Sequence, residues 1–190
     1  GNSTDFGDLT IAKRRLGACA SGTRGLFMGG LNSDGDKQNV IEYVTIASTG
    51  NGTDFGDLLS ILDRSAGCSS TTRGLTGGAQ LSGSPFYSDV IQYVTIASTG
   101  NATDFGDALA TGDDDYPAGA SSETRGLVMG GSFTNVIQYV TIASAGNATD
   151  FGDLTENSGA TTGASSNLRA LRLGGQISNG GTHSDVIDYV

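Results

Sequence analysis

Residues 50–57 read GNGTDFGD, and this stretch recurs almost unchanged at residues 1–8, 100–107 and 146–153. The copies start at intervals of 46 to 50 residues. After each copy come a stretch rich in Gly, Ala and Ser, an apolar run that contains Arg and ends in a Gly pair, and a segment of the form [N/D]VIxYV. Recurrence at this period, with short β-rich runs and many turn signals, favours a propeller blade over a helical repeat.

Each repeat is predicted to form four strands, which we call a, b, c and d in chain order. In the first blade they cover residues 16–21, 24–30, 40–47 and 53–58. Residues 40–47 are apolar on both alternating faces, as expected for a strand between two neighbouring sheets. The Phe of each Asp-Phe-Gly-Asp segment is expected to pack between blades. These residues are Phe6, Phe55, Phe105 and Phe151.

The predicted fold class is all-β: a small β-propeller of four four-stranded antiparallel blades, forming one domain over residues 1–190. The four repeats cover residues 1–49, 50–99, 100–145 and 146–190. We expect the ring to close by pairing of an N-terminal strand d, residues 2–9, with a C-terminal strand c, residues 185–190. Such closure removes the two exposed sheet edges. A piece of a longer array, or two chains that share a larger ring, would have the same sequence.

The order of Gly pair, Tyr after a variable loop, and aromatic residue some twelve positions later resembles the kelch or galactose-oxidase-type propeller repeat. The resemblance covers the whole chain, with Phe where that family has Trp in its last strand, and with fewer blades than kelch rings generally have. The string YVTIASTGNATDFGD at residues 93–107 also resembles repeats of tail-fibre and other virion proteins of marine bacteriophages. That resemblance implies a virion or extracellular location.

Charge and composition exclude several classes of protein. The formal net charge is −10 and the sequence pI is about 4.2, so the field of the protein repels phosphate backbones and anionic lipid. No apolar run approaches the roughly 18 residues that span a bilayer. We therefore expect neither nucleic-acid binding nor membrane insertion. The chain opens at Gly1 with no signal-like segment, which indicates a processed or partial chain.

The repeats differ mainly in two sets of loops. The b–c loops contain between three and ten residues, and the d–a connections differ in charge and composition. Antiparallel strand order places both sets at one end of the ring, and variable loops on a regular scaffold are how repeat proteins usually present a binding surface. The candidate contact residues are Arg14, Arg15, Asn32, Asp34, Phe86, Tyr87, Asp115, Tyr116, Phe133 and His183, together with Lys13, Asp36 and Asn179. The aromatic members could stack on sugar rings or could pack on the blade edges.

Enzyme chemistry has little support in the sequence. The single His183 lies in a loop rich in Gly and Ser, and neither Cys19 nor Cys68 has a His nearby in the sequence. Both cysteines are expected to be small residues in a packed wall. The recurrent Asp pairs are expected to make turn hydrogen bonds or to pair with the recurrent arginines, rather than to hydrolyse glycosides.

No cofactor is predicted. Residues 32–36 begin like an EF-hand loop, but Lys37 stands where Gly is required and Tyr43 stands where a bidentate Glu is required. A calcium ion held by fewer protein ligands remains an alternative.

Two functional hypotheses follow. The first is a non-enzymatic binding module of a virion or cell-surface structure, whose variable loops recognise a surface glycan or a host receptor. The second is a structural or decoration subunit that packs against other virion proteins or against copies of itself. The contact surface distinguishes them, because a binding module needs exposed variable loops.

Overall fold

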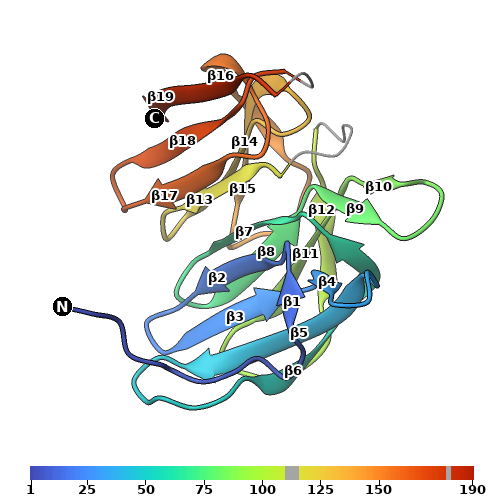
Figure 1. Ribbon diagram of the computed structural model, residues 1–190. Coiled ribbons are helices and arrows are strands. Elements are labelled where there is room, and N and C mark those ends of the chain that lie inside the picture. The colour runs from blue at the N-terminus through green and yellow to red at the C-terminus, as the bar shows by residue number, and fades with distance from the viewer. Residues whose placement is uncertain (110–115, 179–180) are drawn as a thin grey trace.

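The computed structural model describes residues 1–109, 116–178 and 181–190, and the regular secondary structure in these ranges consists of β-strands (Figure 1). Four small antiparallel sheets are arranged like the blades of a four-bladed propeller, which confirms the predicted architecture. In the described ranges, no helix is long and apolar enough to cross a membrane.

Each of the first three blades contains strands a to d, and blade 4 contains strands a to c. Blade 1 consists of β2 (Gly17–Ala20), β3 (Arg24–Met28), β5 (Gln38–Thr45) and β6 (Thr53–Asp63). Blade 2 consists of β7 (Ala66–Ser69), β8 (Arg73–Gly77), β11 (Val90–Thr95) and β12 (Thr103–Asp107). Blade 3 consists of β13 (Ala118–Ser121), β14 (Arg125–Met129), β15 (Thr134–Thr141) and β16 (Thr149–Ser158). Blade 4 consists of β17 (Thr162–Ser165), β18 (Ala170–Gln176) and β19 (His183–Tyr189).

The Asp-Phe-Gly-Asp segment forms a recurrent irregularity in strand d. The register between strands c and d shifts at the same place in blades 1, 2 and 3, for example between Ile91 and Gln92. The Gly of the segment, Gly106 in blade 2, has a φ of 142°, a region that favours glycine. Its N–H donates to the Asp104 side chain at 3.0 Å. The Asp therefore makes the turn hydrogen bond that the sequence predicts.

Apolar residues from neighbouring blades form the core. Leu26 and Ile41 of blade 1 pack in one cluster with Val94 and Ile96 of blade 2, and equivalent residues pack between blades 2 and 3. Phe55 and Phe105 are buried in these clusters as predicted, and Ala residues of the next c–d turn are in the same clusters. Phe6 and Phe151 are exposed instead. Phe151 lies next to blade 4, and the three strands of that blade do not bury it as the following blades bury Phe55 and Phe105.

The predicted closing strand pair does not form in this structure. Within the described residues, β18 is the one strand that pairs with β19, and residues 1–9 contain no strand. Residues 6–8 instead lie against the c–d turn of blade 1, where the Gly50 N–H donates to the Phe6 carbonyl at 2.8 Å. Strands d of blades 1 and 2 accept the same hydrogen bond from the c–d turn of the following blade. For example, the Gly100 N–H donates to the Phe55 carbonyl at 2.7 Å.

The spacing of the inner strands gives a physical reason for this difference. A Cβ added at Gly67 would lie 2.2 Å from the Ala18 carbonyl oxygen, and a Cβ at Gly119 or Gly163 would meet the preceding inner strand at 2.2 or 2.3 Å. Blades 2, 3 and 4 therefore need Gly at this position. The first blade has Ala18 there, so β2 cannot accept β17 at the spacing used between the other blades.

Candidate functional site: the variable-loop end

The b–c loops and d–a connections are joined to one another at one end of the blades, which we call the variable-loop end. β1 (Lys13–Arg14), which leads into blade 1, pairs with β4 (Leu31–Asn32) of the first b–c loop. The second b–c loop forms a hairpin of β9 (Ala79–Leu81) and β10 (Tyr87–Ser88), and β9 pairs with the end of β6. The loops are thus held in place by backbone hydrogen bonds across blade boundaries.

Asp63, at the end of β6, is the centre of a cluster of charges. Its carboxylate is almost fully buried, and Lys37 Nζ lies 2.9 Å from Oδ1. The guanidinium groups of Arg15 and Arg64 lie 3.8 Å and 3.7 Å from Oδ2. Lys37 also donates to the Gln80 side chain at 2.7 Å and to the Leu81 carbonyl at 2.8 Å. Lys37 therefore ties the b–c loops of blades 1 and 2 to strand d of blade 1.

Tyr116 lies beside Arg15, which was also predicted as a contact residue, and beside Arg64, which was not. The guanidinium carbons of Arg15 and Arg64 lie 5.9 Å and 5.2 Å from the centre of its ring. Arg15 and Arg64 occupy equivalent positions before strand a and have φ angles of 61° and 60°, and the Arg64 N–H donates to the Arg15 carbonyl at 2.8 Å. Arg64 was not among the predicted contact residues, although its equivalence to Arg15 in the repeat is visible in the sequence.

The other predicted aromatic residues lie on separate loops. Phe86 is 61% exposed and directly precedes β10, where the Leu81 N–H donates to its carbonyl at 2.7 Å. The β9–β10 hairpin projects from the blades in Figure 1. Tyr87 is half-buried within β10. Phe133 is half-buried in a tight turn, where Ser132 and Phe133 both have positive φ and the Thr134 N–H donates to the Gly131 carbonyl at 3.0 Å. Of the four predicted aromatic contact residues, Phe86 is exposed and the other three are half-buried.

The remaining predicted contact residues have mixed roles. Asn32 is structural, because its Oδ1 accepts hydrogen bonds from the Asp34 N–H at 3.0 Å and the Asp36 N–H at 2.8 Å. The side chains of Asp34, Arg14 and His183 are exposed. Asp115 and Asn179 lie outside the described residues.

Lys13 is not a surface contact, which corrects the prediction. Its Nζ lies 2.6 Å from Glu42 Oε2, and neither side chain is exposed. Glu42 also accepts hydrogen bonds from the N–H and the hydroxyl of Thr10. Burial by itself would raise the pKa of Glu42, but the hydrogen bonds from Lys13 and Thr10 and the charge of Lys13 outweigh it and hold that pKa below its ordinary value.

The recurrent polar residues join neighbouring blades. The Asn101 side chain of one c–d turn accepts a hydrogen bond from the Asp57 N–H of the preceding blade at 3.0 Å. Arg73 lies over the ring of Tyr93 at 4.7 Å and donates to the Ile142 carbonyl of the next blade at 3.0 Å. The recurrent arginines therefore stack on tyrosines, and the alternative pairing with the recurrent Asp residues is wrong.

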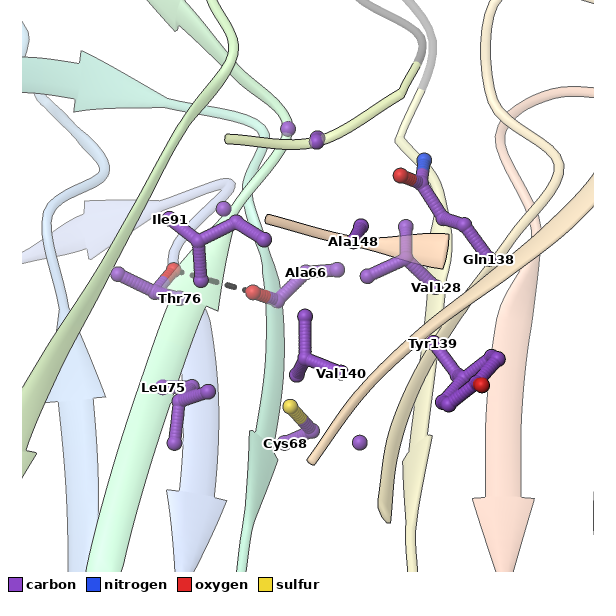
Figure 2. A pocket seen from close by; sticks show the side chains of 14 residues that line it. Ala66, Cys68, Leu75, Thr76, Ile91, Val128, Gln138, Tyr139, Val140 and Ala148 are labelled. Atoms are coloured by element: carbon purple, nitrogen blue, oxygen red, sulfur yellow. Dashed lines mark hydrogen bonds between the residues drawn. The ribbon is translucent and has the colours of Figure 1, made fainter. Parts of the chain in front are cut away.

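Cys68 lines an apolar cavity between blades 2 and 3 (Figure 2). In Figure 2, Leu75 and Ile91 face Val128 and Val140 across this cavity, and the Thr76 hydroxyl donates to the Ala66 carbonyl at 3.0 Å. Its volume of about 20 Å³ is close to that of one water molecule, and its walls are apolar, so it is too small for an organic ligand. Both cysteines pack as predicted, and burial raises the pKa of each thiol to about 12.

Over residues 1–109, 116–178 and 181–190, no three His, Cys, Asp or Glu side chains are grouped so that they could hold a metal ion. The comparison with protein families finds no model that matches this chain, and the comparison with curated proteins finds no match either.

Proposed function

We propose that this chain is a non-enzymatic binding module of a virion or cell-surface structure, and that its variable-loop end recognises a surface glycan or a host receptor. The observation that carries the proposal is the cross-blade anchoring of the variable loops by the β1–β4 pair, the β6–β9 pair and the Lys37 contacts. A binding surface gains affinity when its loops are already ordered, because less conformational entropy is lost on binding.

The chemistry at this end suits a carbohydrate. Phe86 presents an exposed aromatic ring, and Arg15, whose side chain is one-third exposed, stands beside Tyr116. Aromatic rings stack on the apolar faces of sugars, and arginine donates paired hydrogen bonds to carboxylates. The location in a virion or outside the cell is supported by the resemblance of residues 93–107 to repeats of marine phage virion proteins. We propose no catalytic role, no nucleic-acid partner and no membrane insertion.

A second candidate is a structural subunit that packs against other virion proteins. It is favoured by the unpaired edge of β19, where Ile187 and Tyr189 are both exposed. Unpaired edges and exposed apolar residues are features of protein–protein contacts.

Binding of the purified chain to a broad glycan array separates the two candidates. We expect saturable binding that is lost when Phe86, Tyr87, Tyr116 and Phe133 are all changed to Ser. The matched control is Leu168→Ser, which changes a highly exposed apolar residue on an a–b turn and should leave binding unchanged. Absence of binding to any glycan, with circular dichroism showing a folded protein, would favour the structural candidate.

A further inference from the structure

The outer surfaces of blade 1 and blade 4 differ in how closely their residues resemble those that form the contacts between neighbouring blades. Within the chain, each blade offers one surface to the blade that follows and another to the blade that precedes. We call the surface of blade 4 that points away from blade 3 the blade-4 face. It contains Ala164, Arg169, Ile187 and Tyr189.

The blade-4 face has the residues that bind a following blade. Ile187 corresponds to Ile41, Ile91 and Ile137, which are 0%, 5% and 1% exposed between blades, whereas Ile187 is 61% exposed. Arg169 stacks on Tyr189 at 5.0 Å. In blades 1 and 2 the equivalent arginines also stack on tyrosines, and their guanidinium groups donate hydrogen bonds to the following blade. Arg24 donates to the Ile96 carbonyl at 2.8 Å, and Arg73 donates to the Ile142 carbonyl.

Serine residues link the inner strands in the same direction. The Ala20 N–H donates to the Ser69 hydroxyl at 3.3 Å, and the Ser69 N–H donates to the Ser121 hydroxyl at 3.1 Å. The Ser121 N–H donates to the Ser165 hydroxyl at 3.0 Å. A blade that follows another therefore contributes a hydroxyl at this position and a Gly two residues earlier, where the close approach excludes a Cβ.

The first blade departs from the repeat at both of these positions. It has Ala18 where the following blades have Gly67, Gly119 and Gly163, and Ala20 where they have serine. At the spacing found inside the chain, the Cβ of Ala18 would overlap the carbonyl of a preceding inner strand, and Ala20 has no hydroxyl to accept a hydrogen bond. Ala18 and Ala20 are both exposed.

We propose that the blade-4 face is a docking surface for a β-blade of this same repeat type, one that has Gly and Ser at the positions of Ala18 and Ala20. The occupant is identified by continuity with the interface that the chain already contains three times. Ala18 and Ala20 prevent the chain's own first blade, or that of a second copy, from occupying this surface. Such a device keeps a head-to-tail repeat from polymerising with itself. This inference does not depend on the proposed glycan recognition.

The docking surface is tested by extending the full chain. A copy of residues 95–140, appended after Val190, supplies the next c–d turn, a strand d and a blade with Gly119 and Ser121. The matched control is the same extension with Gly119→Ala and Ser121→Ala in the appended copy only. We expect hydrogen exchange at residues 186–189 to slow by about tenfold or more in the first extension and clearly less in the control. Equal exchange rates in the two extensions, or no slowing in either, would overturn the proposed surface.

Sedimentation velocity tests the role of Ala18 and Ala20. The wild-type chain should be monomeric, and the Ala18→Gly/Ala20→Ser variant should associate as its concentration rises. Adding Ala164→Leu, which places a larger side chain on the blade-4 face, should return that variant to the monomer. Because Ala164 is exposed, this change should not affect folding. Association of the wild-type chain to the same extent as the double variant, or a double variant that stays monomeric, would show that these two alanines do not exclude the first blade.

Discussion

Lys13 and Glu42 form a fully buried ion pair, 2.6 Å apart, between the segment that precedes blade 1 and strand c of that blade. The second repeat has Leu62 and Gln92 at the equivalent positions, and the Leu59 N–H donates to the Gln92 side chain at 2.6 Å. Blade 4 repeats the charged arrangement, with Arg172 Nη2 at 2.6 Å from Asp188. The same buried position thus has a neutral amide in the middle of the chain and a compensated carboxylate in blades 1 and 4.

Removing one member of the pair should be costly. We expect Lys13→Leu to lower the free energy of unfolding by about 3 kcal/mol, because it leaves the Glu42 carboxylate buried without a counter-charge. Adding Glu42→Gln should recover most of the loss, since the double variant has the residues of the next repeat. Urea unfolding monitored by circular dichroism measures both values. A single variant within about 0.5 kcal/mol of wild type would contradict the buried pair.

The same pair predicts an acid-dependent loss of stability. The pKa of Glu42 in the folded chain is below its ordinary value of 4.5, so its contribution is present above that pH. As the pH falls from 4.5 towards the folded pKa, the unfolded chain binds a proton at Glu42 that the folded chain does not yet bind, and the free energy of unfolding decreases. The contribution of Glu42 is lost once the pH has fallen through the folded pKa. The urea midpoint of wild type should therefore fall more steeply below pH 4.5 than that of Lys13→Leu/Glu42→Gln. Parallel pH profiles would show that Glu42 does not titrate as the geometry requires.

Both cysteines should be unreactive in the folded chain. Burial raises the pKa of Cys68 to about 12. The pKa of Cys19 is also raised to about 12, mainly by burial and to a smaller extent by electrostatic repulsion from Cys68. The thiolate is the reactive form, so at pH 8 almost none is present. A disulfide reagent should report two thiols only after denaturant is added. Rapid modification of either cysteine under native conditions would contradict the packing between blades.

The recurrent Arg–Tyr stack should stabilise the chain most where it also crosses to the next blade. Arg73 stacks on Tyr93 and donates to the Ile142 carbonyl, whereas Arg125 stacks on Tyr139 at 4.6 Å and makes no such bond among the described residues. We expect Arg73→Gln to cost about 2 kcal/mol more than Arg125→Gln, the value of a charge-assisted hydrogen bond. Equal costs in thermal or urea unfolding would show that the carbonyl contact contributes nothing.

The repeat period, the order of strands and the buried role of Phe55, Phe105 and the cysteines could be predicted from the sequence, because they depend on recurrence and alternation alone. The unpaired β19 could not, because ring closure depends on how closely the inner strands of the first and last blades can approach, which a linear sequence does not show. Lys13 was predicted at the surface, since a lysine in a charged d–a connection usually is, and only the packed structure shows Glu42 beside it. Lys37 was missed because its contacts with Gln80 and Leu81 cross a blade boundary that a linear sequence does not show, whereas the equivalence of Arg64 to Arg15 is visible in the repeat.

Two single substitutions test whether recognition occurs at the variable-loop end. Phe86→Ser alters an exposed residue of the β9–β10 hairpin, and Leu168→Ser alters an exposed residue of an a–b turn at the opposite end. The dissociation constant of each variant is measured for the glycan that wild type binds best on the array. We expect at least about tenfold weaker binding for Phe86→Ser, roughly 1.4 kcal/mol, and unchanged binding for Leu168→Ser. Retained binding in Phe86→Ser together with loss in Leu168→Ser would place recognition at the other end and contradict the account.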